Sequence, residues 1–159
     1  MSYLLALAAG LTALWLLLSG YFDNTLLLSF GAGSILFTLY LAHRMGLIDR
    51  EGVPIQLFPG ILWYWAWLFL QIGKANFAVA RAVLSPDVAI NPKVFRVEAT
   101  QKTDVGKATF ANSITLTPGT VSVDLHDGEV LVHALTEDLA DVDGIAEMGA
   151  RVCAIEGPA

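Results

Sequence analysis

The chain has 159 residues, of which 55% are hydrophobic and only 15% are charged. Because about 25% of the residues of a soluble globular protein are charged, this composition excludes an ordinary soluble domain and indicates a membrane protein. The formal net charge of −6 disfavours nucleic-acid binding, and the single cysteine, Cys153, excludes an internal disulfide and a cysteine metal cluster. Most acidic residues follow Pro86, so we expect a membrane part followed by a small polar domain.

Two uncharged stretches open the chain, the first up to Phe22 and the second from Asn24 to His43. Each is close to the roughly 20 residues that a helix needs to cross a hydrocarbon core. We therefore predict a transmembrane helical hairpin over residues 1–43, with a tight turn at Asp23 and Asn24.

A cleaved signal peptide is the alternative for the first stretch. That stretch lacks the positively charged residues that precede the apolar core of such a peptide, so a retained anchor is favoured. In the second stretch, Gly31, Gly33 and Ser34 are small enough to permit close approach of another helix.

A third apolar run occupies residues 59–85, after a predicted cytoplasmic loop at 44–58. Its first half holds an aromatic cluster, and its polar residues recur three, four or seven positions apart, which places them on one face of a helix. Aromatic rings and cationic heads both favour the membrane interface. The residues predicted to contact the membrane interface or another subunit are Trp63, Trp65, Trp67, Lys74, Asn76 and Arg81.

The distribution of basic residues predicts the topology. Positive charges favour the cytoplasmic side, so Arg44 and Arg50 place the loop after the second helix inside. If the third segment fully crossed the membrane, four basic residues would lie outside, against this bias: Lys74, Arg81, Lys93 and Arg96. We favour a third helix that lies along the cytoplasmic face or dips into it, and full crossing remains the alternative.

A linker at residues 86–93, rich in Pro, Asp and Asn, precedes a predicted domain at 94–159. The alternation of Val94–Ala99 predicts a strand. Thr103 followed by Asp104 is typical of a helix start, because the threonine oxygen can accept free backbone amides.

The uncharged run FANSITLTPGTVSVDL is no fourth span, because Pro118 and Gly119 interrupt it and its hydroxyl groups would need partners in lipid. We predict a helix through about Ile114, a Pro-Gly turn, and a strictly alternating strand from Thr120 to Leu125.

The rest of the domain continues with an Asp-Gly hairpin and a last helix. The stripe predicted to be buried on that helix is Leu139, Val142, Ala146, Gly149 and Cys153. The fold class predicted for the whole chain is a membrane protein with an α-helical hairpin, a third apolar or amphipathic helix, and a small α+β domain of order β-α-β-β-α on the cytoplasmic side.

No catalytic, cofactor-binding or metal-ligating residue is predicted, because the sequence holds no P-loop, dinucleotide fingerprint, G-x-S-x-G or H-E-x-x-H motif. Asp124 and His133 lie on adjacent predicted strands and would form at most an ordinary cross-strand pair. Lys74 is more readily explained as a lysine that reaches toward headgroups or a partner subunit than as a proton relay.

Four segments carry a resemblance to a known family. The most specific is ANSITLTPGTVSVDL (Ala111–Leu125), followed closely by VLVHAL (Val130–Leu135), and GKANFAVARAVLSP (Gly73–Pro86) and WLLLSG (Trp15–Gly20) support it. The chain resembles the E-type (MrpE-like) subunits of the multisubunit cation/proton antiporters of the Mrp (Mnh, Pha) type of bacteria. The family positions expected to serve fold and assembly are Asn112, Ser113, Thr115, Thr117, Pro118, Gly119, Thr120, Asp124 and His133.

The resemblance implies a non-enzymatic subunit, without cofactors, of a hetero-oligomeric complex that exchanges Na+ or K+ for H+. It implies a multi-pass protein of the bacterial plasma membrane with a cytoplasmic C-terminal domain, which contributes to assembly while larger subunits move the ions. The alternatives are a membrane-tethered adaptor or sensor and, less favoured, an anchored enzyme. Isolation of the gene from those of other antiporter subunits would count against the first interpretation.

Overall fold

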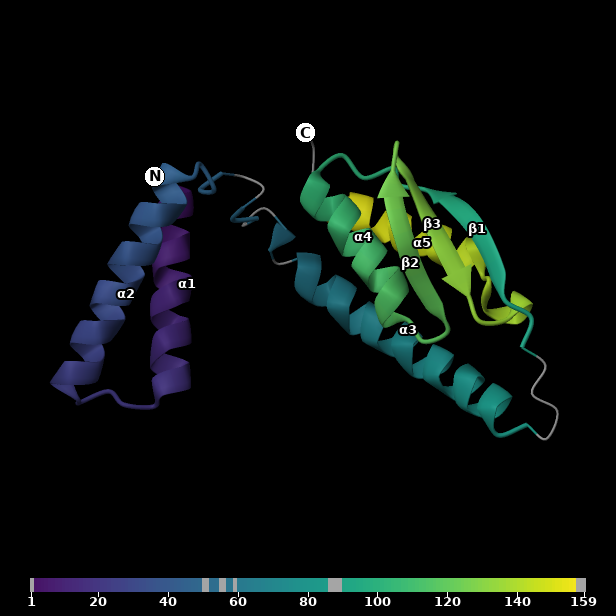
Figure 1. Ribbon diagram of the computed structural model, residues 1–159, viewed down its shortest axis with the longest axis horizontal. Helices are drawn as coiled ribbons and strands as arrows, with labels where there is room; N and C mark the ends of the chain where they lie inside the picture. The colour runs from purple at the N-terminus through teal and green to yellow at the C-terminus, as the bar shows by residue number, and fades with distance from the viewer. Residues whose placement is uncertain (1, 50–51, 55–56, 59, 86–89, 157–159) are drawn as a thin grey trace. The chain divides into compact units, whose positions relative to one another are not determined.

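The structure is a computed structural model that describes residues 2–49, 52–54, 57–58, 60–85 and 90–156. It divides into two compact units, Met1–Ile55 and Gln56–Ala159, each of which is described by itself (Figure 1). Of the sequence predictions, Arg50 and positions 86–89 of the predicted linker lie outside the described residues.

The first unit is a hairpin of α1 (Ser2–Ser19) and α2 (Thr25–Arg44). Asn24 ends the turn, because its side chain accepts hydrogen bonds from the amides of Leu26 and Leu27 at 3.1 and 3.2 Å. Both helices are long and apolar enough to cross a membrane, and no other helix of the described residues passes the same test. The two apolar helices predicted from the sequence are therefore present.

The two hairpin helices touch where Trp15 of α1 packs against Gly31 of α2. Gly31 is the only buried residue of the described hairpin. A Cβ atom at Gly31 would lie 2.7 Å from Cδ1 of Trp15, whereas one at Gly33 would meet no atom within 4 Å. Close helix approach thus depends on Gly31, one of the small residues singled out in the sequence.

The second unit joins a three-stranded antiparallel sheet to helices, and its strand order is β1-β3-β2. Its elements in chain order are α3 (Gly60–Val83), β1 (Lys93–Glu98), α4 (Asp104–Leu116), β2 (Thr120–His126), β3 (Glu129–Ala134), the short 3-10 helix η2 (Glu137–Leu139) and α5 (Val142–Glu156). From β1 to α5 the order is the predicted β-α-β-β-α, with η2 added before the last helix.

Local signals in the sequence explain these boundaries. Thr103 caps α4 by accepting a hydrogen bond from the Gly106 amide at 2.9 Å. Gly119 has φ +92°, as the second central position of a type II turn requires. Asp127 and Gly128 have φ values of 52° and 77°, which a two-residue hairpin turn of type I′ needs.

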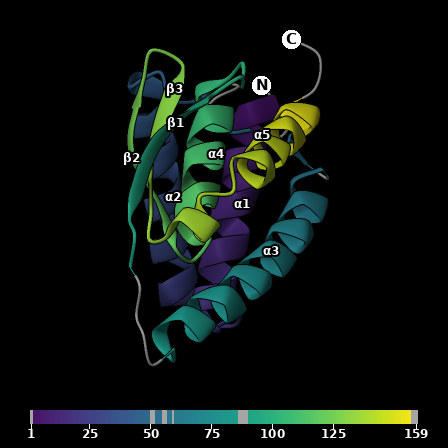
Figure 2. The ribbon, with the colours of Figure 1, turned by 90° about the vertical axis from the view of Figure 1, so that its right-hand side faces the viewer.

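The unit is layered, with α4 and α5 between the sheet and α3 (Figure 2). The core lies between the sheet and these helices, and its fully buried side chains are Phe110, Ile114, Val130, Val132 and Val152. From α3, Tyr64 and Leu68 join the same core, so this helix packs on the sheet domain.

Two details of the sequence prediction are wrong. The register shifts between Ser122 and Asp124, so a bulge interrupts the strict alternation of β2. The buried face of α5 shares only Gly149 with the predicted stripe, since Val142 is 50% exposed and Ala146 is also exposed. The residues buried on α5 are Ile145, Met148, Gly149, Val152 and Glu156.

Candidate membrane and subunit contact surfaces

One face of α3 is attached to the sheet domain by a buried polar contact. The hydroxyl of Tyr64 donates to Oγ of Ser113 at 2.7 Å, and Ser113 Oγ donates to the carbonyl oxygen of Thr109 at 2.6 Å. Both Tyr64 and Ser113 are buried. Because a buried hydroxyl without a partner is costly, this pair selects one position of α3 on α4.

The predicted aromatic cluster of α3 divides between two directions. Trp67 is half-buried, its ring centroid lies 5.9 Å from that of Tyr64, and the guanidinium of Arg151 lies 4.4 Å above it. Trp63 and Trp65 instead point away from the domain and are 79% and 55% exposed. The structure therefore assigns Trp67 to internal packing and leaves the other two tryptophans available for contacts outside the unit.

The side of α3 that faces away from the domain carries mostly large apolar side chains. We call it the open face of α3. Its large exposed side chains are Leu62, Trp63, Trp65, Phe69, Leu70, Phe77, Val83 and Leu84. Exposed apolar side chains in such numbers are typical of a surface that contacts a membrane or another protein. Asn76, also predicted at this surface, is exposed.

Lys74 and Arg81 lie at the border between the open face of α3 and the domain. Both line a cleft of about 680 Å³ that is closed on its other side by the segment around η2. The structure thus brings together two of the predicted contact residues, although it places them beside the domain and not at the tryptophan end of the helix.

The hydroxyl groups of the family motif bond the backbone at the junction of α4 and β2. Thr120 Oγ1 donates to the carbonyl oxygen of Ile114 at 2.7 Å, and Thr117 Oγ1 donates to that of Ser113 at 2.9 Å. Thr115 Oγ1 accepts the amide of Ser122 at 3.1 Å. These groups already have local partners, which fits a role in shaping the turn. Asn112 is exposed, and Pro118 is half-buried in the turn.

Asp124 and His133 are not partners across the hairpin. The register pairs His133 with Val121 on one side and Val94 on the other, whereas Asp124 pairs with Leu131. The expected cross-strand pair is therefore wrong, because the two-residue turn aligns His126 with Glu129 and so places Asp124 opposite Leu131. Val94 and Val121 are 59% and 48% exposed, so two exposed apolar side chains lie on either side of His133 on this face of the sheet.

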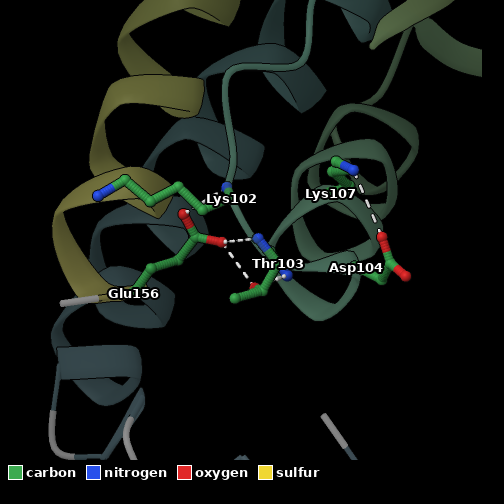
Figure 3. Close-up of polar contacts among 6 residues, drawn as sticks. Lys102, Thr103, Asp104, Lys107 and Glu156 are labelled. Carbon is green, nitrogen blue, oxygen red and sulfur yellow. Dashed lines mark hydrogen bonds and ion pairs between the residues drawn. The ribbon is translucent and has the colours of Figure 1, made fainter. Parts of the chain in front are cut away.

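Glu156 forms a polar clamp that the sequence patterns did not indicate (Figure 3). Its carboxylate accepts the amide of Lys102 at 3.1 Å, the amide of Thr103 at 3.0 Å and the hydroxyl of Thr103 at 2.6 Å. A Cβ atom at Gly106 would collide with this carboxylate. The clamp joins the last turn of α5 to the start of α4. Gly106, which leaves room for the carboxylate, is the feature of the sequence that could have pointed to it.

The same contacts set the acidity of the clamp. Burial raises the pKa of Glu156, but the hydrogen bonds from Thr103 and from the amides of Lys102 and Thr103, together with the Lys102 charge, lower it more, so the pKa lies below its ordinary value. The carboxylate is therefore ionised near neutral pH. A charged acceptor at the start of α4 also suits the positive end of that helix.

No group of three or more His, Cys, Asp or Glu that could hold a metal ion occurs among the residues that the structure describes. An apolar hairpin, together with a small antiparallel sheet backed by helices, defines a membrane protein built for contacts with lipid and other chains. The comparisons with known proteins show its family.

The family model described as "Na+/H+ ion antiporter subunit" (MNHE) matches residues 8–152. The chain belongs to this family, and the resemblance seen in the sequence is confirmed. It is similar to the Na(+)/H(+) antiporter E1 subunit of Staphylococcus haemolyticus, with 33% identity over 140 residues, which are 85% of each chain. It is also similar to the protein of the same name from Staphylococcus epidermidis, with 30% identity over 127 residues, which are 78% of this chain and 77% of that one.

Two solved structures are also similar. A chain in the structure of the membrane-bound sulfane sulfur reductase, an archaeal respiratory membrane complex, has 28% identity and a TM-score of 0.72 and covers 98% of this chain and 99% of its own. A chain of the Mrp complex from Dietzia sp. DQ12-45-1b has 26% identity and a TM-score of 0.43 and covers 57% of this chain and 89% of its own.

Proposed function

We propose that the chain is an accessory, non-catalytic subunit of a multisubunit complex that exchanges Na+ or K+ for H+ across the plasma membrane, and that it contributes to assembly and stability of the complex. The observation that supports this most is the family match, which covers residues 8–152 and so includes both the hairpin and the sheet unit. Its partners in this proposal are the other antiporter subunits and lipid.

The distribution of ionisable groups supports the accessory role. Proton and cation pathways need ionisable side chains at membrane depth. No Asp, Glu, Lys, Arg or His occurs in the sequence between Met1 and Phe22 or between Asn24 and Ala42. The hairpin therefore offers surface for contacts but no relay of its own.

In this proposal α3 lies on the cytoplasmic face of the membrane. Its open face is apolar, and its opposite face holds Tyr64 and Leu68 in the core of the sheet domain. A helix that is buried on one side against a folded domain and apolar on the other suits an interface better than a free span. The domain organisation that follows is a hairpin at 1–43, a loop at 44–58, an interfacial helix at 59–85, a linker at 86–93 and a cytoplasmic domain at 94–159.

The likeness to a chain of the respiratory complex supports a structural role. The architecture of this chain recurs there over 98% of its length, in a complex named for a different activity. An accessory module can be shared between complexes of different chemistry, since it does not perform that chemistry.

The test is deletion of the gene, with antiport measured in everted membrane vesicles and assembly measured by native electrophoresis of the complex. We expect both to fall together and to recover when the full chain is restored. Antiport of normal size in a complex that lacks this subunit would contradict the proposal.

Lys74→Ala is expected to leave transport intact once the complex is assembled, and loss of transport in a fully assembled variant would assign Lys74 a direct role.

A membrane-tethered adaptor is the second candidate, because the outer face of the sheet exposes apolar side chains. Val94, Val121 and Val123 would then bind a soluble partner. Purification that recovers antiporter subunits supports the first function, and recovery of soluble partners alone supports the second.

A further inference from the structure

The cleft between α3 and the η2 segment has the lining of an anionic ligand site. Two cations, Lys74 and Arg81, stand against one carboxylate, Asp138, and the hydroxyl residues Ser85 and Thr136 complete the polar part. Lys74 and Arg81 are seven residues apart, so they lie two turns apart on the same side of α3.

These two cations differ from most others of the sheet unit. Lys93 pairs with Glu137, Arg96 with Glu129, Lys107 with Asp104 and Arg151 with Glu147. Neither Lys74 nor Arg81 forms an ion pair with a carboxylate of the described residues. Their charges are therefore available to an anion that enters the cleft.

The apolar surroundings indicate the kind of anion. A neighbouring hollow of about 430 Å³ shares Phe77, Arg81 and Ser85 with the cleft and is also lined by Leu84. Phe77 and Leu84 are 76% and 82% exposed and belong to the open face of α3. A soluble phosphate would leave this apolar surface in water, whereas the acyl chains of a lipid would cover it.

We propose that this cleft binds an anionic phospholipid, whose headgroup phosphate lies between Lys74 and Arg81 and whose acyl chains run along Phe77 and Leu84. The site rests on the proposed function in placing α3 at the membrane surface. The proposal goes beyond that function, because this cleft would distinguish anionic from neutral lipids.

The test uses the full chain, extracted in mild detergent with equal amounts of phosphatidylglycerol and phosphatidylcholine, and counts retained lipids by native mass spectrometry. We expect the unaltered protein to retain phosphatidylglycerol preferentially. In the double variant K74Q/R81Q we expect this preference to fall about twenty-five-fold, since each cation near an anionic lipid contributes about fivefold.

The control R96Q/K107Q removes the same amount of charge from paired positions of the same domain and should keep the preference. The variant K74R/R81K keeps both charges and should also keep it. Asp138→Asn removes the one carboxylate of the lining and should strengthen phosphatidylglycerol retention several-fold, about the fivefold effect of one charge. This last gain cannot arise from misfolding.

Equal retention by K74Q/R81Q and the unaltered protein would overturn the proposal, and so would equal loss in the R96Q/K107Q control. If K74Q/R81Q kept its lipid but lost antiporter subunits on purification, the cleft would hold an acidic segment of a partner protein instead of a lipid. Each result is independent of the deletion test, because lipid retention is measured on the isolated chain and antiport on the complex.

Discussion

The hairpin and the sheet unit bury their apolar side chains in different ways. Within the hairpin only Gly31 is buried among the described residues, and large side chains such as Leu17 and Leu18 are each 79% exposed. In the sheet unit, Ile114 and Val132 are 0% exposed. The hairpin therefore depends on lipid or partner chains for its apolar contacts, whereas the sheet unit supplies most of its own.

Helix α3 combines a buried face, as in the sheet unit, with an exposed apolar face, as in the hairpin. Its Tyr64 face is part of the domain core, and its Trp63 face is as exposed as the helices of the hairpin. Large apolar side chains that are exposed in the isolated chain therefore indicate surfaces that lipid or other proteins cover. It also predicts that core substitutions act on the sheet unit, while the hairpin responds to changes at the contact between Trp15 and Gly31.

The largest effect is expected from Phe110→Ala in the core of the sheet unit. Phe110 is 1% exposed, so its truncation leaves a cavity and should lower the free energy of unfolding by about 3–5 kcal/mol. Chemical denaturation of the full chain in detergent, followed by limited proteolysis of the sheet unit, measures the loss.

The matched control is Leu116→Ala on the same helix, where the side chain is 59% exposed. It should change the free energy of unfolding by no more than about 0.5 kcal/mol. If both substitutions destabilised the unit equally, α4 would be buried against something outside this chain, and the sheet unit would not be self-sufficient.

The next effect is expected from Glu156→Ala, which removes the clamp between α5 and α4. The amides of Lys102 and Thr103 and the Thr103 hydroxyl lose their acceptor. The expected loss is about 2–3 kcal/mol, because buried donors without a partner are costly. Glu147→Ala on the same helix removes only an exposed pair with Arg151 and should cost at most about 0.5 kcal/mol.

The clamp also predicts a pH dependence. Since the pKa of Glu156 is lower in the folded protein than in the unfolded chain, its carboxylate stabilises the fold above the unfolded pKa of about 4.3. This stabilisation disappears as the pH falls through the folded pKa. The difference in Tm between the protein and its Glu156→Gln variant should therefore shrink in acid, and a constant difference would show that the carboxylate charge is not what stabilises the clamp.

Much of the fold follows from local signals in the sequence. Uncharged stretches of helical length gave the hairpin, and Thr103, the Pro-Gly turn and the Asp-Gly hairpin marked boundaries that the structure confirms. Each of these signals acts through a few neighbouring residues, so no tertiary information is needed to interpret it.

The contacts of α3 and α5 could not be predicted in the same way. The first half of α3, Ile61 to Leu70, is apolar all round, and periodicity alone does not tell which of these residues meet a protein core and which remain open. On α5 the buried face ends in Glu156, which a hydrophobic pattern excludes although its hydrogen bonds make burial possible. The cleft at Lys74 could not be predicted from the sequence either, because its other side is formed by the segment around η2, more than 50 residues later in the chain.

The smallest effect, and the one that tests the hairpin, is expected from Gly31→Ala. A Cβ atom there would lie 2.7 Å from two atoms of the Trp15 ring, so the helices must separate or the indole must move, at a cost of about 1–2 kcal/mol. Spin labels at positions 4 and 40, in a Cys153→Ala background, should report a longer and broader distance in the detergent-solubilised chain.

Gly33→Ala adds the same methyl group to open space and should leave the distance unchanged, while denaturation of the sheet unit should be the same in both variants. An unchanged distance in Gly31→Ala would mean that the hairpin is held by its turn alone, and a destabilised sheet unit would mean that the two regions are coupled.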